Sequence, residues 1–246
     1  MVNSNLDKDK KSLIKVINSA GDYPALLEGI SKLVDEKREL SRYLILPETS
    51  SHPDLLISSE ELTHYNKDWK NQKKALKQED SFMPTPDELA EFLKLLKSGQ
   101  AFDGNGQKVG PKKLEQILHK IITPENYRSE NLDHIYSIKD NKLFVTYHKF
   151  DSSGKLIKVT EQLDPDTLME DRNPGISPDN WIKNPTSQGL PRKSVKKGRL
   201  NYWYPVEGRV AGFDAYPDSA VLDGFGDASD SSADLGVRPA KIFLKK

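Results

Sequence analysis

The sequence predicts an α+β fold, and three observations support this class. Apolar residues recur at helical spacing in the first half of the chain, as far as Ile122. From Ile135 onward the apolar period falls to two, which is the period of extended strands. With 246 residues, the chain can hold one large domain, or one domain with a helical appendage.

The first eighty residues differ from the remainder, and we expect residues 1–80 to be a helical region that tethers the protein or binds a partner. Apolar residues at helical spacing predict amphipathic helices over 13–17 and 26–39. Pro47–Pro53 interrupts this pattern, and a further helix is predicted through Lys67–Lys77. Few aromatic residues interleave with these lysines, which favours a solvated helix face over a nucleic-acid contact.

Residues 81–246 are expected to form the second domain. Thr85–Glu88 is its sharpest helix start, because a threonine can cap a helix, a proline suits the first position and a glutamate can close a capping box. Gly99 marks the expected end of this helix. A second helix is predicted over 111–122.

Strands follow the helices. Alternating segments at 135–138, 143–150 and 156–162, with a turn at Asp140–Asn141, predict an antiparallel meander. A final strand is expected at 241–244.

The window Val210–Asp234 uses nine residue types: Val, Ala, Gly, Phe, Asp, Tyr, Pro, Ser and Leu. It contains no Lys, Glu, Gln, Trp or Met, although these types make up 57 of the 246 residues. A random window of this length would avoid all five about once in a thousand draws. The restricted alphabet therefore indicates an unusual pressure on this segment.

Residues within the window alternate between two sets, which period two places on opposite faces of an extended chain. The set predicted to be buried scaffold is Ala211, Phe213, Ala215, Ala220, Leu222 and Leu235. The set predicted to be displayed is Gly212, Asp214, Tyr216, Ser219, Val221 and Asp223. The displayed set shares no common chemistry, which is unlike a catalytic site and suits a surface that contacts a partner by shape.

Aromatic residues just ahead of the window can form a platform for a sugar or a peptide, although such clusters are more often core anchors. We therefore assign Trp203 to the core and expect Tyr204 and Tyr216 to be exposed. Arg238, between small residues and a final strand, is expected to neutralise a buried carboxylate.

Metal binding and catalysis are the more specific alternatives to a surface that binds a partner by shape. The six aspartates of the window favour a calcium site, but their spacing fits neither an EF-hand loop nor a calcium β-roll. The five histidines are scattered, and His148 is expected to be half-exposed in a strand. The sequence has no cysteine, nucleophile elbow, phosphate loop or dinucleotide fingerprint. We expect no enzyme, metal or cofactor, and keep a calcium-binding lectin or hydrolase that uses Asp223–Asp234 as the alternative.

The composition limits the kinds of partner that we expect for this chain. Lys plus Arg and Asp plus Glu both number 37, so the chain has no net charge and no bulk attraction to nucleic acid or anionic lipid. No segment reads as a signal peptide or a membrane span. We expect a cytoplasmic protein, or one associated with a cell surface or virion through another component.

Three motifs flank or enter the window: Ser187–Pro191 (SQGLP), Tyr202–Pro205 (YWYP) and Leu235–Ala240 (LGVRPA). Together with the window they resemble the C-terminal region of the variable proteins of diversity-generating retroelements, over about residues 82–246. In that family a reverse transcriptase misincorporates at template adenines and so rewrites chosen codons of the variable gene. AAC and AAT codons changed at adenine never encode Lys, Glu, Gln, Trp or Met, which are the five missing types.

The resemblance implies a C-type lectin-like fold in residues 81–246 that presents diversified side chains as a ligand-binding site. It assigns to the contacts the displayed set above together with Phe225, Asp230, Ser231, Ser232 and Asp234. To the fixed scaffold it adds Gly236 and Arg238. It implies a non-enzymatic receptor for an unknown protein or surface glycan, of open oligomeric state.

Two activities of related folds are not expected. The related formylglycine-generating enzymes act through cysteines, which this chain lacks. The Glu-Pro-Asn and Gln-Pro-Asp triplets of calcium-dependent lectins are also missing from the sequence.

Overall fold

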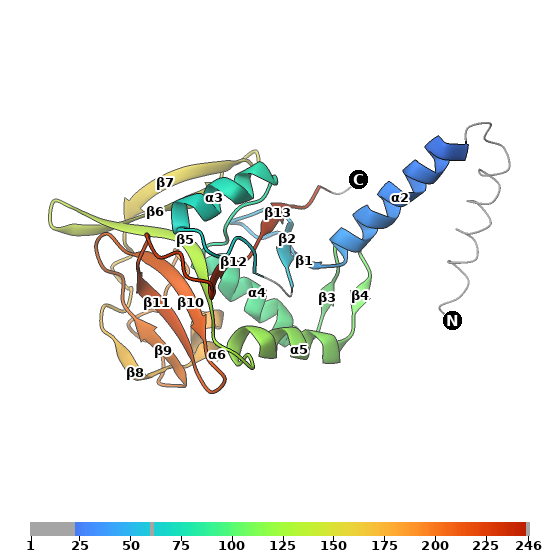
Figure 1. Cartoon of the computed structure of the whole chain (residues 1–246). Coiled ribbons are helices and arrows are strands. Elements are labelled where there is room, and N and C mark those ends of the chain that lie inside the picture. The colour runs from blue at the N-terminus through green and yellow to red at the C-terminus, as the bar shows by residue number, and fades with distance from the viewer. Residues whose placement is uncertain (1–22, 60–61, 245–246) are drawn as a thin grey trace. The chain divides into compact units, whose positions relative to one another are not determined.

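The computed structural model describes residues 23–59 and 62–244, and the chain divides into two compact units (Figure 1). The described part of the first unit, Met1–Ser41, is the helix α2 (Tyr23–Leu40). This helix confirms the one expected over 26–39, whereas the helix expected over 13–17 lies outside the described residues. The second unit is Arg42–Lys246 and contains every strand of the described part.

The two units divide after Ser41 and not near residue 80, where the sequence pattern placed the boundary. Two short strands, β1 (Tyr43–Leu46) and β2 (Leu55–Ser58), pair antiparallel, and β2 also pairs with β13 (Ala240–Ile242) near the end of the chain. The main core includes these buried residues of the three strands: Leu44, Leu46, Leu55, Ile57 and Ala240. Residues 42–80 therefore belong to the same folding unit as the C-terminal strands.

A second, larger sheet has the strand order β7-β6-β5-β10-β11-β9-β8, and β12 pairs in parallel with β5. Its strands are β5 (Arg128–Lys139), β6 (Lys142–Phe150), β7 (Leu156–Gln162), β8 (Arg172–Ile176), β9 (Leu200–Trp203), β10 (Val210–Ala215), β11 (Ala220–Gly226) and β12 (Leu235–Val237). The meander expected from the sequence is confirmed as β5, β6 and β7. Asp140 and Asn141 both have positive φ, as a two-residue hairpin turn requires.

The helix α4 (Pro86–Ser98) begins and ends as the sequence predicts. The Thr85 hydroxyl accepts from the backbone of Glu88, the Glu88 carboxylate accepts from the backbone of Thr85, and Gly99 is the left-handed C-cap. The helix predicted over 111–122 is confirmed as α5 (Pro111–Ile122). The remaining elements are α3 (Trp69–Gln78), α6 (Pro178–Lys183), β3 (Ala101–Phe102) and β4 (Lys108–Val109).

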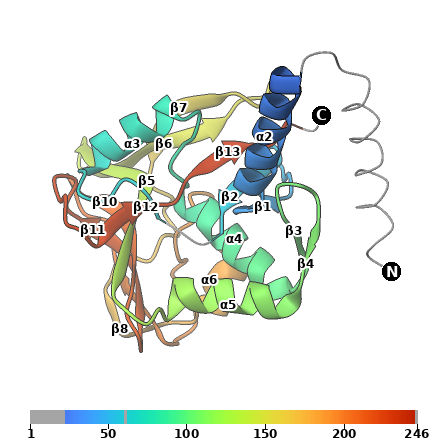
Figure 2. The same ribbon diagram turned by 45° about the vertical axis from the view of Figure 1, so that its right-hand side comes forward.

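The second unit is therefore a mixed α+β structure with a large sheet and hydrophobic side chains on both faces of β10. The helices α4, α5 and α6 pack together on one side of the sheet (Figures 1 and 2), and the main core lies between them and the strands. A smaller core holds Trp69 and Leu76 of α3 against Val210 and Val237. Val210 and Ala211 are consecutive on β10 but belong to different cores.

No helix in the described ranges combines the length and the apolar content needed to cross a lipid bilayer.

Arg238 forms the buried ion pair that the sequence predicts. Arg238 and Glu130 of β5 have side chains that are each 1 % exposed, and Arg238 Nε lies 3.0 Å from Glu130 Oε2. Arg238 Nη1 also donates to the carbonyl oxygen of Ser58, at the end of β2, at 2.7 Å. One side chain thus connects β5, β2 and the segment that follows β12.

Substitution of Arg238 with alanine should lower the free energy of unfolding by about 3–5 kcal/mol, because the buried Glu130 carboxylate loses the contact with Arg238 Nε at 3.0 Å and keeps only the longer contact with Arg128 Nη2, at 3.5 Å. Urea denaturation of the full chain measures this loss. The matched control is Arg192→Ala, since the side chains of the Arg192–Asp166 ion pair are 31 % and 44 % exposed and the pair should contribute less than about 1 kcal/mol. Equal losses in the two variants would contradict the assignment.

Candidate ligand-binding face

The window forms a β-hairpin in the middle of the large sheet. β10 and β11 pair antiparallel with Phe213 opposite Leu222, and β5 and β9 flank them. The predicted scaffold residues of the hairpin are all buried: Ala211, Phe213, Ala215, Ala220 and Leu222. Three scaffold residues after the hairpin are buried as well: Leu235, Gly236 and Arg238. Their expected burial is confirmed.

The positions expected to be displayed divide into three groups. The exposed group is Tyr216, Phe225, Asp230, Ser231, Ser232 and Asp234. Asp214 and Ser219 are half-buried. Gly212, Val221 and Asp223 are buried, so the expectation of exposure is wrong for these three.

Gly212 is buried because α3 covers its end of the hairpin. It pairs with Asn131 of β5, and the Asn131 side-chain amide donates to Gln72 Oε1 of α3 at 2.9 Å. The period of a strand gives the face to which a residue points, but not what another segment places over that face.

Val221 and Asp223 are buried because side chains of the neighbouring strands surround them. Val221 pairs with Asp214 on β10 and with Asn201 on β9, while Asp223 pairs with Trp203 on β9. Val221 and Asp223 both lie on β11, which is placed between β10 and β9, so each residue has neighbours on two sides. Asp223 keeps 8 % of its surface exposed.

Trp203 was expected in the core, and this assignment is wrong. It is 41 % exposed, and its pairing with Asp223 places it on the outward face of the sheet. The adjacent Tyr202 takes the core position, where its hydroxyl donates to the carbonyl oxygen of Leu168 at 2.9 Å. Two consecutive aromatic residues in a strand point to opposite faces, and composition alone does not show which one is inside.

Further aromatic contacts lie beside the hairpin. The rings of Tyr216 and Tyr127 are 4.8 Å apart between centroids, and both residues are partly exposed. The guanidinium of Arg209 lies 4.5 Å from the Phe225 ring centroid, and Arg209 Nη1 is 3.4 Å from Asp227 Oδ2. The sequence analysis missed Tyr127 and Arg209, because both lie outside the window. The pairing of β5 with β10 brings Tyr127 next to Tyr216, and Arg209 lies directly before β10. Knowledge of which strands pair would therefore have identified both residues.

We use the name display face for six residues: Tyr127, Trp203, Asp214, Tyr216, Asp223 and Phe225. Trp203, Asp214, Asp223 and Phe225 lie on the adjacent strands β9, β10 and β11, Tyr216 directly follows β10, and Tyr127 directly precedes β5.

The pKa values of the two carboxyl groups of the display face, Asp214 and Asp223, are raised above their ordinary values. Burial raises the pKa of Asp223 to about 7; the backbone N–H of Phe225 and Arg209 act against this, and the charge of Asp214 adds to it. Burial also raises the pKa of Asp214, which hydrogen bonds from Ser129 and Tyr127 partly offset and the charge of Asp230 increases. The two carboxyl groups are diagonal neighbours on the same face of the β10–β11 pair.

Three glycines of the hairpin differ in the space around them. A Cβ at Gly224 would lie 2.7 Å from the backbone nitrogen of Pro205, and one at Gly226 would lie 3.0 Å from the Val210 carbonyl oxygen. A Cβ at Gly212 would be 3.4 Å from the carbonyl oxygen of Glu130. Backbone therefore closes the space at Gly224, whereas Gly212 leaves an ordinary van der Waals gap.

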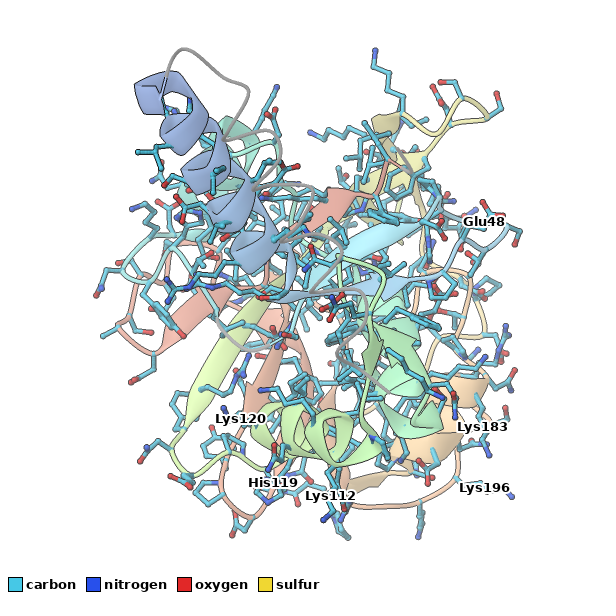
Figure 3. All side chains as sticks on the ribbon, turned by 90° about the vertical axis from the view of Figure 1, so that its right-hand side faces the viewer. Glu48, Lys112, His119, Lys120, Lys183 and Lys196 are labelled. Atoms are coloured by element: carbon cyan, nitrogen blue, oxygen red, sulfur yellow. The ribbon has the colours of Figure 1, made fainter. Side chains whose placement is uncertain are left out.

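A basic region borders the display face at Tyr127. A surface hollow beside Tyr127 is lined by lysines and His119 of α5. Figure 3 shows Lys112, His119 and Lys120 on this helix, at the end of the second unit where Lys183 and Lys196 also lie. Glu115 and Glu125 also line the hollow, so its lining carries charges of both signs with the basic residues in excess.

The aspartates of the window bond mainly to nearby backbone. Asp227 accepts from the backbone of Ser229 at 2.9 Å, and Asp230 accepts from the backbone of Ser232 at 2.9 Å. Among the residues that the structure describes, no three His, Asp or Glu side chains are arranged to hold a metal ion.

His148 is buried and not half-exposed, which corrects the sequence expectation. Its Nδ1 lies 2.7 Å from Asp133 Oδ2 and its Nε2 lies 2.9 Å from Glu88 Oε1. Burial lowers the pKa of His148, but the two carboxylates raise it more strongly, to about 9. With both nitrogens donating, the ring is an imidazolium that joins α4 to the sheet and has no free lone pair with which to accept a proton.

Comparison with protein-family models, with curated proteins and with solved structures yields no match to this chain.

Substitution of Phe213 or Leu222 with alanine should lower the free energy of unfolding by about 2–5 kcal/mol, because each leaves a cavity in the main core. Tyr216→Ala or Phe225→Ala should change it by less than about 1 kcal/mol, since both side chains are partly exposed. Thermal and urea denaturation compare the two pairs. A similar loss in both pairs would reject the division into scaffold and displayed positions.

Substitution of Asp223 with asparagine should stabilise the protein at high pH. The pKa of Asp223 is higher in the folded chain than in the unfolded chain, so wild-type stability falls as the pH rises from about 4 to about 7. Asparagine still accepts from the Phe225 N–H and carries no charge. The variant should be more stable than wild type by about 1–3 kcal/mol at pH 8 and equally stable near pH 4.

Urea denaturation at both pH values measures this difference. The control is Asp227→Asn, because the pKa of the exposed Asp227 is lowered by hydrogen bonds from Ser229, so its substitution should not stabilise at pH 8. A wild type that gains stability relative to Asp223→Asn between pH 4 and pH 8 would overturn the prediction.

Proposed function

We propose that this chain is a non-enzymatic ligand-binding protein that contacts its ligand through the display face and the exposed loop 227–234. The observation that carries the proposal is the burial pattern of the hairpin. Its scaffold positions are buried, and several alternate positions remain partly or fully exposed on the other face. Such a surface can change its side chains without loss of the core that supports it.

We further propose that the chain is a variable protein of a diversity-generating retroelement and that its second unit is a C-type lectin-like domain. The missing residue types and the flanking motifs support the first part. The mixed α+β architecture, with the window on a hairpin of the large sheet, is compatible with the second. The DNA beside the gene tests the origin: a near-repeat of the coding region for 210–234, differing at adenines, should lie near a reverse transcriptase gene.

The chemistry of the display face suits adaptable contacts. Tyrosine and tryptophan offer large, rigid contact areas at low ordering cost, and aspartate and serine provide hydrogen bonds, as in antibody loops. Trp203, Tyr216 and Phe225 are the aromatic anchors from which most binding energy is expected. The ligand class that follows from the resemblance is a protein or a surface glycan.

The paired carboxyl groups Asp214 and Asp223 favour one competing function, a hydrolase that uses one as acid and the other as base. Their raised pKa values are the observation behind it. Two carboxyls that act on one another also occur in ion-pair networks and binding sites. Release of nitrophenol from aryl glycosides by wild type, and its loss in Asp223→Asn, would favour the hydrolase.

A ligand selected from a protein display library against wild type should lose at least tenfold in affinity on Trp203→Ala or Tyr216→Ala, because truncated aromatic anchors cost about 2 kcal/mol or more. Calorimetric titration measures the affinity. The control is Ile157→Ala on β7, since Ile157 is 41 % exposed, as Trp203 is, but lies at the far edge of the sheet. Selected ligands that depend on none of the display-face residues would contradict the proposed function.

A further inference from the structure

The negative charge of the display face is concentrated on two neighbouring strands. Asp214 pairs with Val221 and Gly212 pairs with Asp223, so the two carboxylates are diagonal neighbours across the β10–β11 pair. Diagonal positions on a sheet are roughly 7 Å apart, within reach of a single cation between them. Asp171 and Asp230 add further negative charge next to this pair.

Gly212 separates the two carboxylates without adding a side chain. It lies directly opposite Asp223 and two residues before Asp214 on the same face of the sheet. Because α3 covers Gly212, a group from a partner reaches the pair from the side of the half-buried Asp214 and the exposed Trp203 and Tyr216.

The charge of the pair is not neutralised within the protein. In the part of the chain that the structure describes, neither Asp214 nor Asp223 takes part in an ion pair. Arg209, the cation that acts on Asp223, is held by Asp227 and by the Phe225 ring. Burial of uncompensated carboxylates costs stability, which a cation from outside would recover.

Aromatic rings border the same space. Trp203 pairs with Asp223, and Tyr216 follows Asp214 by two residues and stacks near Tyr127. The faces of such rings attract cations and also pack well against an aliphatic stem. Carboxylates with aromatic neighbours thus match a Lys or Arg side chain in both its charged and its apolar part, whereas an anionic group would be repelled.

We propose that the display face captures a Lys or Arg side chain of a partner protein, with the cation between Asp214 and Asp223 and the stem against Trp203 and Tyr216. This inference rests on the proposed function and adds the chemistry of the partner. The occupant is a protein surface and not a neutral glycan, because two adjacent carboxylates gain most from an opposite charge. A partner surface that carries both charges would place its cationic side chain at the carboxylates and its anionic side chains near the lysines of α5, beyond Tyr127.

The test uses two peptides of equal length, one that alternates arginine with glycine and one in which citrulline replaces each arginine. Citrulline keeps the shape and removes the charge. Titration of the full chain, followed by the indole N–H signal of Trp203 in an NMR spectrum, measures binding at the face itself. The signal is assigned by Trp203→Phe, since Trp69 and Trp181 are buried.

The arginine peptide should bind wild type at least tenfold more tightly than the citrulline peptide. The double variant Asp214→Asn/Asp223→Asn should lose at least tenfold in affinity for the arginine peptide and retain its affinity for the citrulline peptide. The control is Asp140→Asn, which removes an exposed carboxylate at the β5–β6 turn and should leave both affinities unchanged. A thermal melt of each variant shows that the fold is kept.

Equal binding of the two peptides to wild type, or no loss in the double variant, would overturn the capture of a cation. A random peptide library separates this failure from that of the proposed function. If the selected peptides depend on Trp203 and Tyr216 but are not enriched in Lys or Arg, the ligand-binding function is supported and the capture of a cation is rejected. If no selected peptide depends on Trp203 or on Tyr216, both the capture of a cation and the proposed ligand-binding function are contradicted.

Discussion

The buried pair of Arg238 and Glu130 is the interaction on which the arrangement of the strands depends. Glu130 lies on β5 between Ser129 and Asn131, which point to the display side, and Arg238 also holds the end of β2. A buried pair of charges adds little net stability, but it tolerates few alternative positions, because moving either group leaves a charge unpaired. The pair thereby connects β5, which is also the neighbour of β10, to β2 and to the segment that follows β12.

Local signals in the sequence predicted much of this fold. The capping box at Thr85 and Glu88 gave the start of α4, and period two gave the β5–β7 meander and the burial of Phe213 and Leu222. The pairing of β2 with β13 was not predictable, because it joins segments far apart in the chain. The same applies to Asp223 and His148, whose burial comes from side chains of other elements and not from their own neighbours in sequence.

Apolar burial and the partly buried carboxyl groups lie on opposite faces of the same strands. The main core supplies apolar burial, while the display face holds carboxyl groups whose charged forms are disfavoured. A neutral residue at Asp223 would relieve this cost. Groups that destabilise the free protein and can be neutralised by a partner are typical of binding sites, where preorganised charge contributes to affinity.

The close approach of the backbone at Gly224 has a consequence for the history of the gene. The Phe225 side chain is 45 % exposed, whereas a Cβ at position 224 would meet the backbone nitrogen of Pro205 at 2.7 Å, in the segment that precedes β10. Under the diversification that we propose, the codon for Gly224 would have to be spared while codon 225 varies. The template for this gene would then lack adenine at the glycine codon, and the architecture of the sheet would be recorded in nucleotides as well as in protein.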